Sequence, residues 1–444
     1  MLDLNKIEQY RENNRIEAKL AQGGFPHSVW ETYSAFANTL GGIILLGVKE
    51  LKDKSFECVE LPSPEALAEE FMQVASDKRL VSVNLLSDKS INIVEHKGHR
   101  IVTVEIPQAQ RRQKPVFVYG DFTHGAYRRG GEGDYRCSPE QIRSMIRDRA
   151  DIGADRRIIE SLPIDCIDPT CVRRYRRLLY KAGSDVLWQN LNDIDFLYRI
   201  EAIALGSDSM PHPTCAGLLM FGNPKSISGI FPQYGIFLRT FDNDGINYTD
   251  NLFNSFFAIY ERLCRQVGND DSLKKTVYEG LINSVIHADY LSGSNIGIIS
   301  GGGSIVISNP GNMRVSYDTF SPESRTEKRN PVLSNMFVLI KAAHDCGHGF
   351  ELMHKQNGVR LFDKFDPDRT VFSMYYDNGS GGKIFNKTEN NIIDFLTDNI
   401  SCSAYEIAIV FNLTLEFAQI CLDKLVKNDI VVFNKNINKY VLKS

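Results

Sequence analysis

Three carboxylates and a lysine stand close together near the start of the chain. Glu12 and Glu17 are followed by Lys19, and Glu50 comes a short way downstream. Carboxylate oxygens hold hard divalent cations, which polarise a phosphoryl oxygen and generate hydroxide from bound water. These residue types therefore suit hydrolysis of a phosphodiester if the chain brings them together. The alternative is that they are surface carboxylates paired with Lys19 and nearby arginines.

The segment between these acids predicts one helix and one strand. Glycines and a proline at 23–26 precede apolar residues that recur at helical spacing from Val29 to Leu40. Gly41 and Gly42 supply the permissive backbone of a tight reversal. The apolar run 43–48 is short enough for a buried strand, so the carboxylates flank a helix and its two neighbouring strands.

This pattern resembles the Schlafen AlbA-type domain. The hallmark of that family is a Glu, a second Glu five residues later within E-x-K, then S-A-F-A-N-T-x-G-G and a strand ending in G-V. The matching residues here are Glu12, Glu17 with Lys19, the segment 34–39, Gly41, Gly42, Gly47 and Val48. The resemblance implies a metal-dependent site that binds Mg²⁺ or Mn²⁺ through Glu12, Glu17 and Glu50 and cuts RNA, notably tRNA. Glu50 stands where the family usually has Asp, and Lys19 would stabilise charge on the phosphorus.

Cations and aromatic residues alternate between Arg111 and Arg129. Cations neutralise phosphates and aromatic rings stack on bases, which is the combination that single-stranded nucleic acid needs. In the resembling family a strand here ends Y-x-R-x-G, which extends the resemblance to about residue 150. The other interpretation is that the rings belong to the core and the arginines face solvent. The candidate nucleic-acid contacts are Arg111, Arg112, Lys114, Tyr127, Arg128 and Arg129, interleaved with Phe117 and Tyr119.

Residues 151–240 are expected to form a connector. Its helical pattern carries Arg173, Arg174, Arg176 and Arg177, which we interpret as a solvated helix face, with contact to a phosphate backbone as the alternative. A segment at 214–222 resembles the A-G-L-L-x-F-G bridge of bacterial Schlafen-like regulators.

A second polar pattern lies on the long helix predicted at 272–290. Val277, Leu281 and Val285 recur every four residues and are expected to pack inward. Glu279, Asn283 and His287 recur at the same spacing on another face. Such polar groups are costly if they are buried without partners, so this stripe indicates a ligand face.

The helix, the hairpin after it and Asn309-Pro310-Gly311 together resemble the GHKL ATPase fold. The resemblance implies that Asn283 coordinates Mg²⁺, that Glu279 activates water, and that Asn309 receives the adenine amino group. A degenerate domain that serves as a scaffold is the alternative, and no P-loop sequence is present. The candidate ATP contacts are Glu279, Asn283, His287, Asn309, Gly311, Gly347 and Gly349.

The end of the chain predicts a winged helix. Helical patterns at 391–397, 404–411 and 415–428 precede an alternating hairpin at 430–442. The third helix has only Lys424 and Lys427 as cations, so a partner-binding or dimerisation role is as consistent with it as DNA binding.

Composition narrows the class of protein. The chain has 444 residues, 43% of them hydrophobic, and a net charge of −4. Residues 97–181 are locally basic, with 18 Lys or Arg against 11 Asp or Glu. Nine scattered cysteines without a C-x-x-C pair indicate reduced thiols and a cytoplasmic protein, and no apolar run is long enough to cross a membrane.

The fold class expected from these patterns is α+β with several domains. We expect a Schlafen AlbA-type domain at 1–150, a connector at 151–240, a GHKL ATPase-like domain at 241–378 and a winged helix at 385–444. The leading functional hypothesis is a metal-dependent RNA endonuclease with a nucleotide-binding regulatory domain, acting in stress or phage defence. The alternatives are an ATP-gated, DNA-binding transcriptional regulator and an assembly scaffold, and a homo-oligomer is left open.

Overall fold

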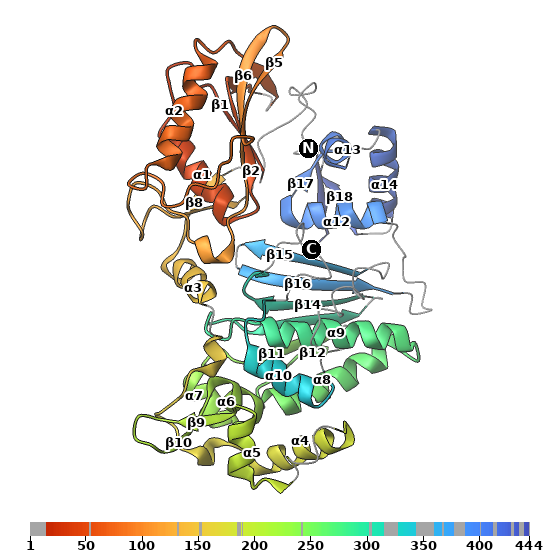
Figure 1. Ribbon diagram of the computed structural model, residues 1–444. Helices are drawn as coiled ribbons and strands as arrows, with labels where there is room; N and C mark the ends of the chain where they lie inside the picture. Colours follow the sequence, from red (N-terminus) through yellow and green to blue (C-terminus); the bar gives the residue numbers. More distant parts are fainter. Residues whose placement is uncertain are drawn as a thin grey trace. The chain divides into compact units, whose positions relative to one another are not determined.

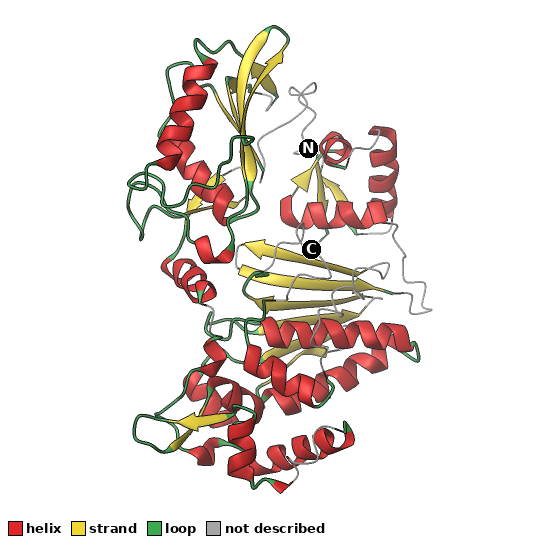
Figure 2. Ribbon diagram, in the orientation of Figure 1, coloured by secondary structure: helices red, strands yellow, loops and turns green. Residues whose placement is uncertain are grey.

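The structure is a computed structural model of the whole chain. It describes residues 15–52, 55–130, 133–150, 153–183, 188, 190–240, 243–301, 304–314, 327–342, 359–365, 368–376, 387–399, 401–411, 415–427, 430–434 and 439–443. The chain divides into two compact units, Met1–Ala150 with Thr388–Ser444, and Asp151–Lys387. Figure 1 labels the elements and Figure 2 shows the mixture of helices and strands in both units, which agrees with the expected α+β class.

A four-stranded sheet organises the N-terminal part of the first unit. Its order is β1 (Ile16–Lys19), β2 (Gly42–Leu46), β6 (His99–Ile106) and β5 (Ile91–His96), with β1 parallel to β2 and the other pairs antiparallel. Helices α1 (Ser28–Asn38) and α2 (Pro64–Ser76) pack on this sheet, as Figure 1 shows. Val29, Tyr33 and Phe36 of α1 are buried against it. The predicted helix and strand at 29–48 are therefore confirmed.

Smaller elements complete this part of the unit. Strand β3 (Val48–Glu50) pairs with β4 (Phe56–Cys58), and β7 (Tyr127–Gly130) pairs with β8 (Gly133–Arg136), ahead of α3 (Pro139–Arg149). The apolar segment 81–86 lies outside the named strands and forms one bridge, between Val81 and Val118. Part of its backbone bonds to a side chain of α1 instead, because the Tyr33 hydroxyl donates to the Val83 carbonyl and accepts from the Leu85 amide.

The C-terminal part of the first unit has three helices and a small sheet. The helices are α12 (Lys387–Asn399), α13 (Ala404–Val410) and α14 (Leu415–Lys427). Strands β17 (Ser401–Cys402), β19 (Lys439–Leu442) and β18 (Val431–Asn434) follow in that spatial order. The predicted helices and hairpin are present in the expected sequence order, and their assignment to the winged-helix class stays a prediction.

A six-stranded mixed sheet forms the centre of the second unit. Its spatial order is β12 (Asn243–Tyr248), β11 (Ile236–Thr240), β13 (Ile296–Gly301), β14 (Ser304–Pro310), β16 (Asp368–Tyr375) and β15 (Val359–Phe365). Helices α8 (Leu252–Val267), α9 (Asp271–His287) and α10 (Pro331–Leu339) lie together beside it in Figure 1. Val277, Leu281 and Val285 are fully buried, as their spacing predicts.

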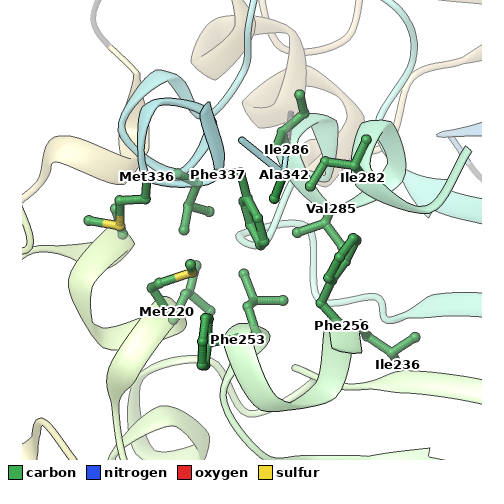
Figure 3. Close-up of a cluster of buried hydrophobic side chains, with 14 of the residues drawn as sticks. Met220, Ile236, Phe253, Phe256, Ile282, Val285, Ile286, Met336, Phe337 and Ala342 are labelled. Atoms are coloured by element: carbon green, nitrogen blue, oxygen red, sulfur yellow. The ribbon is translucent and has the colours of Figure 1, made fainter. Parts of the chain in front are cut away.

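The segment expected to be a connector shares the core of this unit. It contains α4 (Pro169–Lys181), α5 (Asp193–Arg199), β9 (Ile203–Leu205), β10 (Pro211–Pro213), α6 (Cys215–Phe221) and α7 (Pro224–Ile230). Figure 3 shows Met220 of this segment among the same buried side chains as Phe253, Phe256 and Phe337. Tyr175 of α4 also donates a hydrogen bond to the Met336 carbonyl, at 2.6 Å. Residues on both sides of the expected boundary at 240 thus form one core.

No helix in the described part of the chain is long and apolar enough to cross a bilayer.

Candidate functional site

The S-A-F-A-N-T segment of α1 acts as a scaffold for two distant stretches of backbone. The Ser34 hydroxyl donates to the Val116 carbonyl at 2.7 Å and accepts from the Tyr127 amide at 2.9 Å. The Asn38 amide group donates to the Val116 and Tyr127 carbonyls and accepts from the Val116 amide. Because buried backbone groups need partners, these small polar side chains fix the path of the chain around 116 and 127.

The same helix positions a buried ion-pair cluster made of Glu17, Lys19, Arg129 and Asp134. Glu17 Oε2 accepts from the Arg129 guanidinium at 2.6 Å, and Glu17 Oε1 accepts from Lys19 Nζ at 2.5 Å. Arg129 also pairs with Asp134 at 2.9 Å, and Asp134 accepts from the Thr32 hydroxyl of α1 at 2.6 Å. The Arg129 backbone amide donates to the Thr39 hydroxyl. One arginine therefore ties β1, α1 and the β7–β8 hairpin together.

Charge is balanced inside this cluster. Burial alone would lower the pKa of Arg129, but the charges of Glu17 and Asp134 outweigh it and raise that pKa above its ordinary value. The Arg129 guanidinium also lies 5.3 Å from the Phe36 ring centroid. Lys19 is the most exposed member, with 20% of its side chain accessible, so it is the group of this cluster best placed to meet an external anion.

The described carboxylates do not by themselves make a metal centre. Both oxygens of Glu17 already accept from cations. Glu50 lies on β3, a strand that contacts β1, and Glu12 lies outside the described residues. Among the residues that the structure describes, no three His, Cys, Asp or Glu side chains are grouped to hold an ion. The predicted site of Glu12, Glu17 and Glu50 stays a prediction.

Two of the predicted nucleic-acid contacts have internal partners. Arg111 donates to the carbonyls of Asp148, Arg149 and Ala150, and so caps the C-terminus of α3. Lys114 donates to the Asn38 carbonyl at 3.0 Å. Both side chains are thus engaged within the domain while half-buried, and their contact with a nucleic-acid strand stays a prediction.

The predicted Tyr-Arg-Arg segment is also internal. Tyr127, Arg128 and Arg129 are all buried, and the Tyr127 hydroxyl donates to Glu31 at 2.9 Å. Burial raises the pKa of Tyr127, and Glu31 acts in the same direction. Tyr127 is therefore a core ring and not an open stacking platform, whereas Arg112 remains exposed.

The sequence analysis missed an exposed pair on β8. Tyr135 is 63% exposed, and Arg136 is exposed beside it. Arg136 Nε donates to the Tyr127 hydroxyl at 3.2 Å. No local pattern indicates this pair, because three residues are too few to show an alternation, and it is the pairing of β8 with β7 that places Tyr135 on the opposite face from Asp134 and Arg136.

In the second unit, the predicted row of polar residues lies on α9. Glu279 is buried, and Asn283 donates to the Glu279 carbonyl at 2.7 Å, one helical turn away. His287 ends the helix, and its carbonyl accepts from Arg329. Burial, together with the charges of Arg329, Arg314 and Lys328, lowers the pKa of His287 to about 3. The ring is therefore neutral at pH 7, mainly because it is poorly solvated.

The turn after β14 lies against one of these cations. Asn309 is buried, and its side chain donates to the Pro310 carbonyl. Gly311 has φ +87°, and a Cβ there would lie 2.5 Å from the Arg329 guanidinium, so only glycine fits. Gly347 and Gly349 lie outside the described residues. The predicted ATP contacts that are described thus gather from α9 and the end of β14, next to a positive cluster.

One of the two cations predicted on the last helix is already paired. Lys424 of α14 donates to both oxygens of Glu389, at 2.7 and 2.9 Å, and Glu389 is buried. This pairing removes Lys424 from the candidates for contact with DNA phosphates.

Comparison with known proteins identifies two regions. Residues 12–138 match the family model described as Schlafen, AlbA_2, and residues 143–237 match a domain of unknown function, DUF8451. No curated protein matches the chain. These two matches do not reach residues 238–444, so the ATPase and winged-helix assignments remain proposals.

Two solved structures are similar over different shares of the chain. The DIP2311 protein from Corynebacterium diphtheriae is 12% identical with a TM-score of 0.40, covering 97% of this chain and 79% of that one. The N-terminal domain of a RecG-related protein from Nitrosomonas europaea is 29% identical with a TM-score of 0.24, covering 30% of this chain and 90% of that one. At these TM-scores neither likeness bears on function. Residues 12–138 form a Schlafen/AlbA_2 domain, which points to a function that involves nucleic acid.

Proposed function

We propose that this protein binds single-stranded RNA through its Schlafen/AlbA_2 domain, across the β7–β8 hairpin. The observation that carries the proposal is the exposed Tyr135 ring on a hairpin that Arg129 holds in place, with the exposed Arg136 next in the chain on the other face of the strand. An aromatic face that stacks on a base and a cation that neutralises the adjacent phosphate are the two elements of sequence-tolerant binding.

The Tyr135 ring is ordered by its own hairpin. Cβ atoms added at Gly130 and Gly133 would lie 3.0–3.3 Å from ring atoms of Tyr135, so the ring rests on bare glycine backbone. The next residue on either side is fixed too, because Asp134 pairs with Arg129 and Arg136 bonds to Tyr127. A ring that is held in one place loses little conformational freedom when a base stacks on it.

Fluorescence anisotropy with a labelled single-stranded RNA tests this contact. Replacing Tyr135→Ala removes the stacking surface and is expected to weaken binding by about 5- to 150-fold, the equivalent of about 1–3 kcal/mol per stacked base. Tyr135→Phe keeps the ring and is the matched control, expected to bind like the parent protein. If the parent protein binds no RNA, the proposal fails. If Tyr135→Ala binds as tightly as Tyr135→Phe, the hairpin is not the contact.

Cleavage of the bound RNA is the second candidate function. It is favoured by the 2.5 Å contact between Glu17 and Lys19, which places a partly exposed cation beside a buried carboxylate. Lys19 can neutralise a phosphate that approaches this edge, and Glu17 holds the Lys19 ammonium in position. The described donors do not fit a metal ion without Glu12, so no catalytic step is assigned to one.

Incubation with tRNA in the presence and absence of Mn²⁺ separates binding from cleavage. Cleavage that disappears in Glu17→Gln while RNA binding persists supports the nuclease. Intact tRNA together with selective binding of duplex DNA supports the transcriptional regulator instead.

The second unit is proposed to bind a nucleotide. Arg314, Lys328 and Arg329 act on His287 at the end of α9, where an anionic phosphate would be attracted. Asn283 is one turn earlier on the same helix and is the residue implied for Mg²⁺. Titration with a fluorescent ATP analogue is expected to show binding that Asn283→Ala abolishes or weakens. Unchanged binding in that variant would refute the assignment of this residue.

A further inference from the structure

Helix α4 presents a row of cations to solvent on one side. Its buried side consists of Cys171, Val172, Tyr175 and Leu179, which pack into the core of the second unit. Its other side exposes Arg173, Arg174, Arg177, Tyr180 and Lys181. The structure thus places most of the arginines of the expected solvated face on one side of the helix.

Among the described residues, the exposed cations of α4 have no acidic partner. Arg173 donates to the Thr170 hydroxyl, and Arg174 donates to the Asn254 side chain, so both partners are uncharged. Within the described part of the chain, Arg177 and Lys181 form no ion pair. Arg176 is different, because it pairs with Asp193 at 2.5 Å at the edge of this row.

Acids stand on both sides of this helix in the sequence, and Asp185, which follows it, lies outside the described residues. Asp168 accepts from the Thr170 amide at 2.8 Å and so caps the helix N-terminus, and Asp165 precedes it. The cations extend from there toward the C-terminal end. Tyr180 adds a ring that is 64% exposed within the same row.

We infer that the exposed side of α4, defined by Arg173, Arg174, Arg177, Tyr180 and Lys181, is a second surface that binds the phosphate backbone of a nucleic acid. From Arg173 to Lys181 the helix advances by about 12 Å, the length of duplex axis over which one strand places roughly three to four phosphates, at about 3.4 Å each. The inference rests on the proposed function, because it extends nucleic-acid binding to a region matched only to a domain of unknown function.

A membrane surface fits this helix less well than a nucleic acid. Interfacial helices insert their apolar side among acyl chains. The apolar side of α4 is already occupied, since Tyr175 is fully buried and bonded to the Met336 carbonyl. What remains exposed is mainly cationic, which is complementary to a polyanion with regularly spaced charges.

The test measures the salt dependence of RNA binding by the full-length protein. In Arg173→Gln/Arg177→Gln/Lys181→Gln, the slope of log K against log salt is expected to fall by about 2, since each phosphate contact contributes about 0.7 for a single strand. Affinity at about 100 mM salt is expected to fall at least about tenfold. The probe is a labelled single-stranded RNA longer than the helix footprint, with a labelled duplex DNA of equal length in parallel.

The matched control removes three exposed lysines elsewhere in the same unit. Lys225→Gln/Lys275→Gln/Lys341→Gln changes the net charge equally and is expected to keep the slope. Arg173→Lys/Arg177→Lys keeps the charges on α4 and is expected to retain binding. Circular dichroism of each variant establishes that the fold is retained.

The outcomes distinguish this inference from the function on which it rests. An unchanged slope and affinity in the α4 variant overturns the inference and leaves RNA binding by the first domain intact. Failure of the parent protein to bind RNA or DNA overturns both. Loss of binding to phosphatidylserine vesicles, with nucleic-acid binding unchanged, overturns the inference in favour of a membrane surface.

Discussion

Two polar regions of this molecule treat buried charge in opposite ways. In the first domain, Arg129 lies between two carboxylates and Lys19 completes the pairing, so each charge has an opposite partner. In the second unit, burial and then three nearby cations lower the pKa of His287, and the ring stays neutral. The first region keeps its charges by pairing them, and the second avoids an additional positive charge by giving up a proton.

This difference predicts different consequences of mutation. A balanced buried cluster is sensitive to the loss of any single member, because the remaining charge is left in a poorly solvated place. A group that is neutral in the folded state has little effect on the free energy of unfolding at neutral pH. It lowers that free energy only at acidic pH, where the unfolded state binds a proton that the folded state does not. Substitutions therefore test the first region through stability and the second through pH.

The largest effect is expected from Arg129→Met. This change leaves Glu17 and Asp134 buried without their shared cation, and breaking a buried pair in this way costs about 3–5 kcal/mol of unfolding free energy. Urea unfolding in a Trp188→Phe background measures the effect, because Trp30 then reports on the first domain alone. Arg143→Gln, which removes an exposed partner of Glu140, is the control and is expected to cost less than about 1 kcal/mol. Equal costs for both variants would show that the cluster is not buried.

A smaller loss is expected from Asn38→Ala. The variant leaves the Val116 amide and the Tyr127 carbonyl without their Asn38 partner, at a cost of roughly 2–3 kcal/mol, while the Val116 carbonyl keeps the Ser34 hydroxyl. Asn38→Asp is a useful comparison, because it retains an acceptor for the Val116 amide but loses the donor. The same fluorescence-detected unfolding gives the values, and a cost below that of the exposed Arg143→Gln control would contradict the scaffold role of α1.

The sequence predicted the elements of this region better than the contacts of its side chains. Helical spacing from Val29 to Leu40 and the apolar run after Gly42 are local patterns, and both elements are present. The position of Arg111 is set by its capping of α3, which lies far along the chain, so no local pattern could indicate it. Tyr135 was missed because the residues after Gly130 and Gly131 look like part of a turn. Only the pairing of β7 with β8 shows on which face of the strand the ring lies.

The candidate site shows the same division. Glu17, Lys19 and Arg129 were singled out from sequence, and the structure brings them together. Their expected roles as metal ligand and strand contact depend on exposure and on partners, which spacing does not encode. For the cations of α4, the sequence indicated only a solvated helix face. The buried side of the helix, which the structure defines, shows that these cations share one exposed side.

In the second unit, Asp155→Ala is expected to cost about 1–2 kcal/mol, the usual value for loss of a helix cap. Asp155 accepts from the Val332 and Leu333 amides at the start of α10, because the side chain of Asn330 donates instead to Ile286 and Ala288. Hydrogen exchange of α10 measures the loss, and Asp155→Asn is the control that keeps an acceptor. Equal protection in all three proteins would rule out the cap.

Asp155 also makes a pH prediction with a definite sign. Burial raises its pKa to about 6, against 3.8 for the unfolded chain, so the folded state holds the proton more tightly. Its contribution to stability is present below about pH 4 and is lost as the pH rises to 6. Asp155→Asn is expected to remove this decline, which urea unfolding at several pH values will show.

The smallest effect at neutral pH is expected from His287, and its sign is opposite to that of Asp155. The folded pKa of about 3 lies below the unfolded value of 6.5, so the unfolded state binds the proton first as the pH falls. Stability is complete above pH 6.5 and declines below it, with a slope under the limit of about 1.4 kcal/mol per pH unit for one proton. His287→Gln is expected to abolish this part of the decline and to leave stability at pH 7 nearly unchanged. Because Asp155 acts in the opposite direction between pH 4 and 6, the comparison is made in an Asp155→Asn background. A decline that persists there after His287→Gln would show that His287 does not cause it.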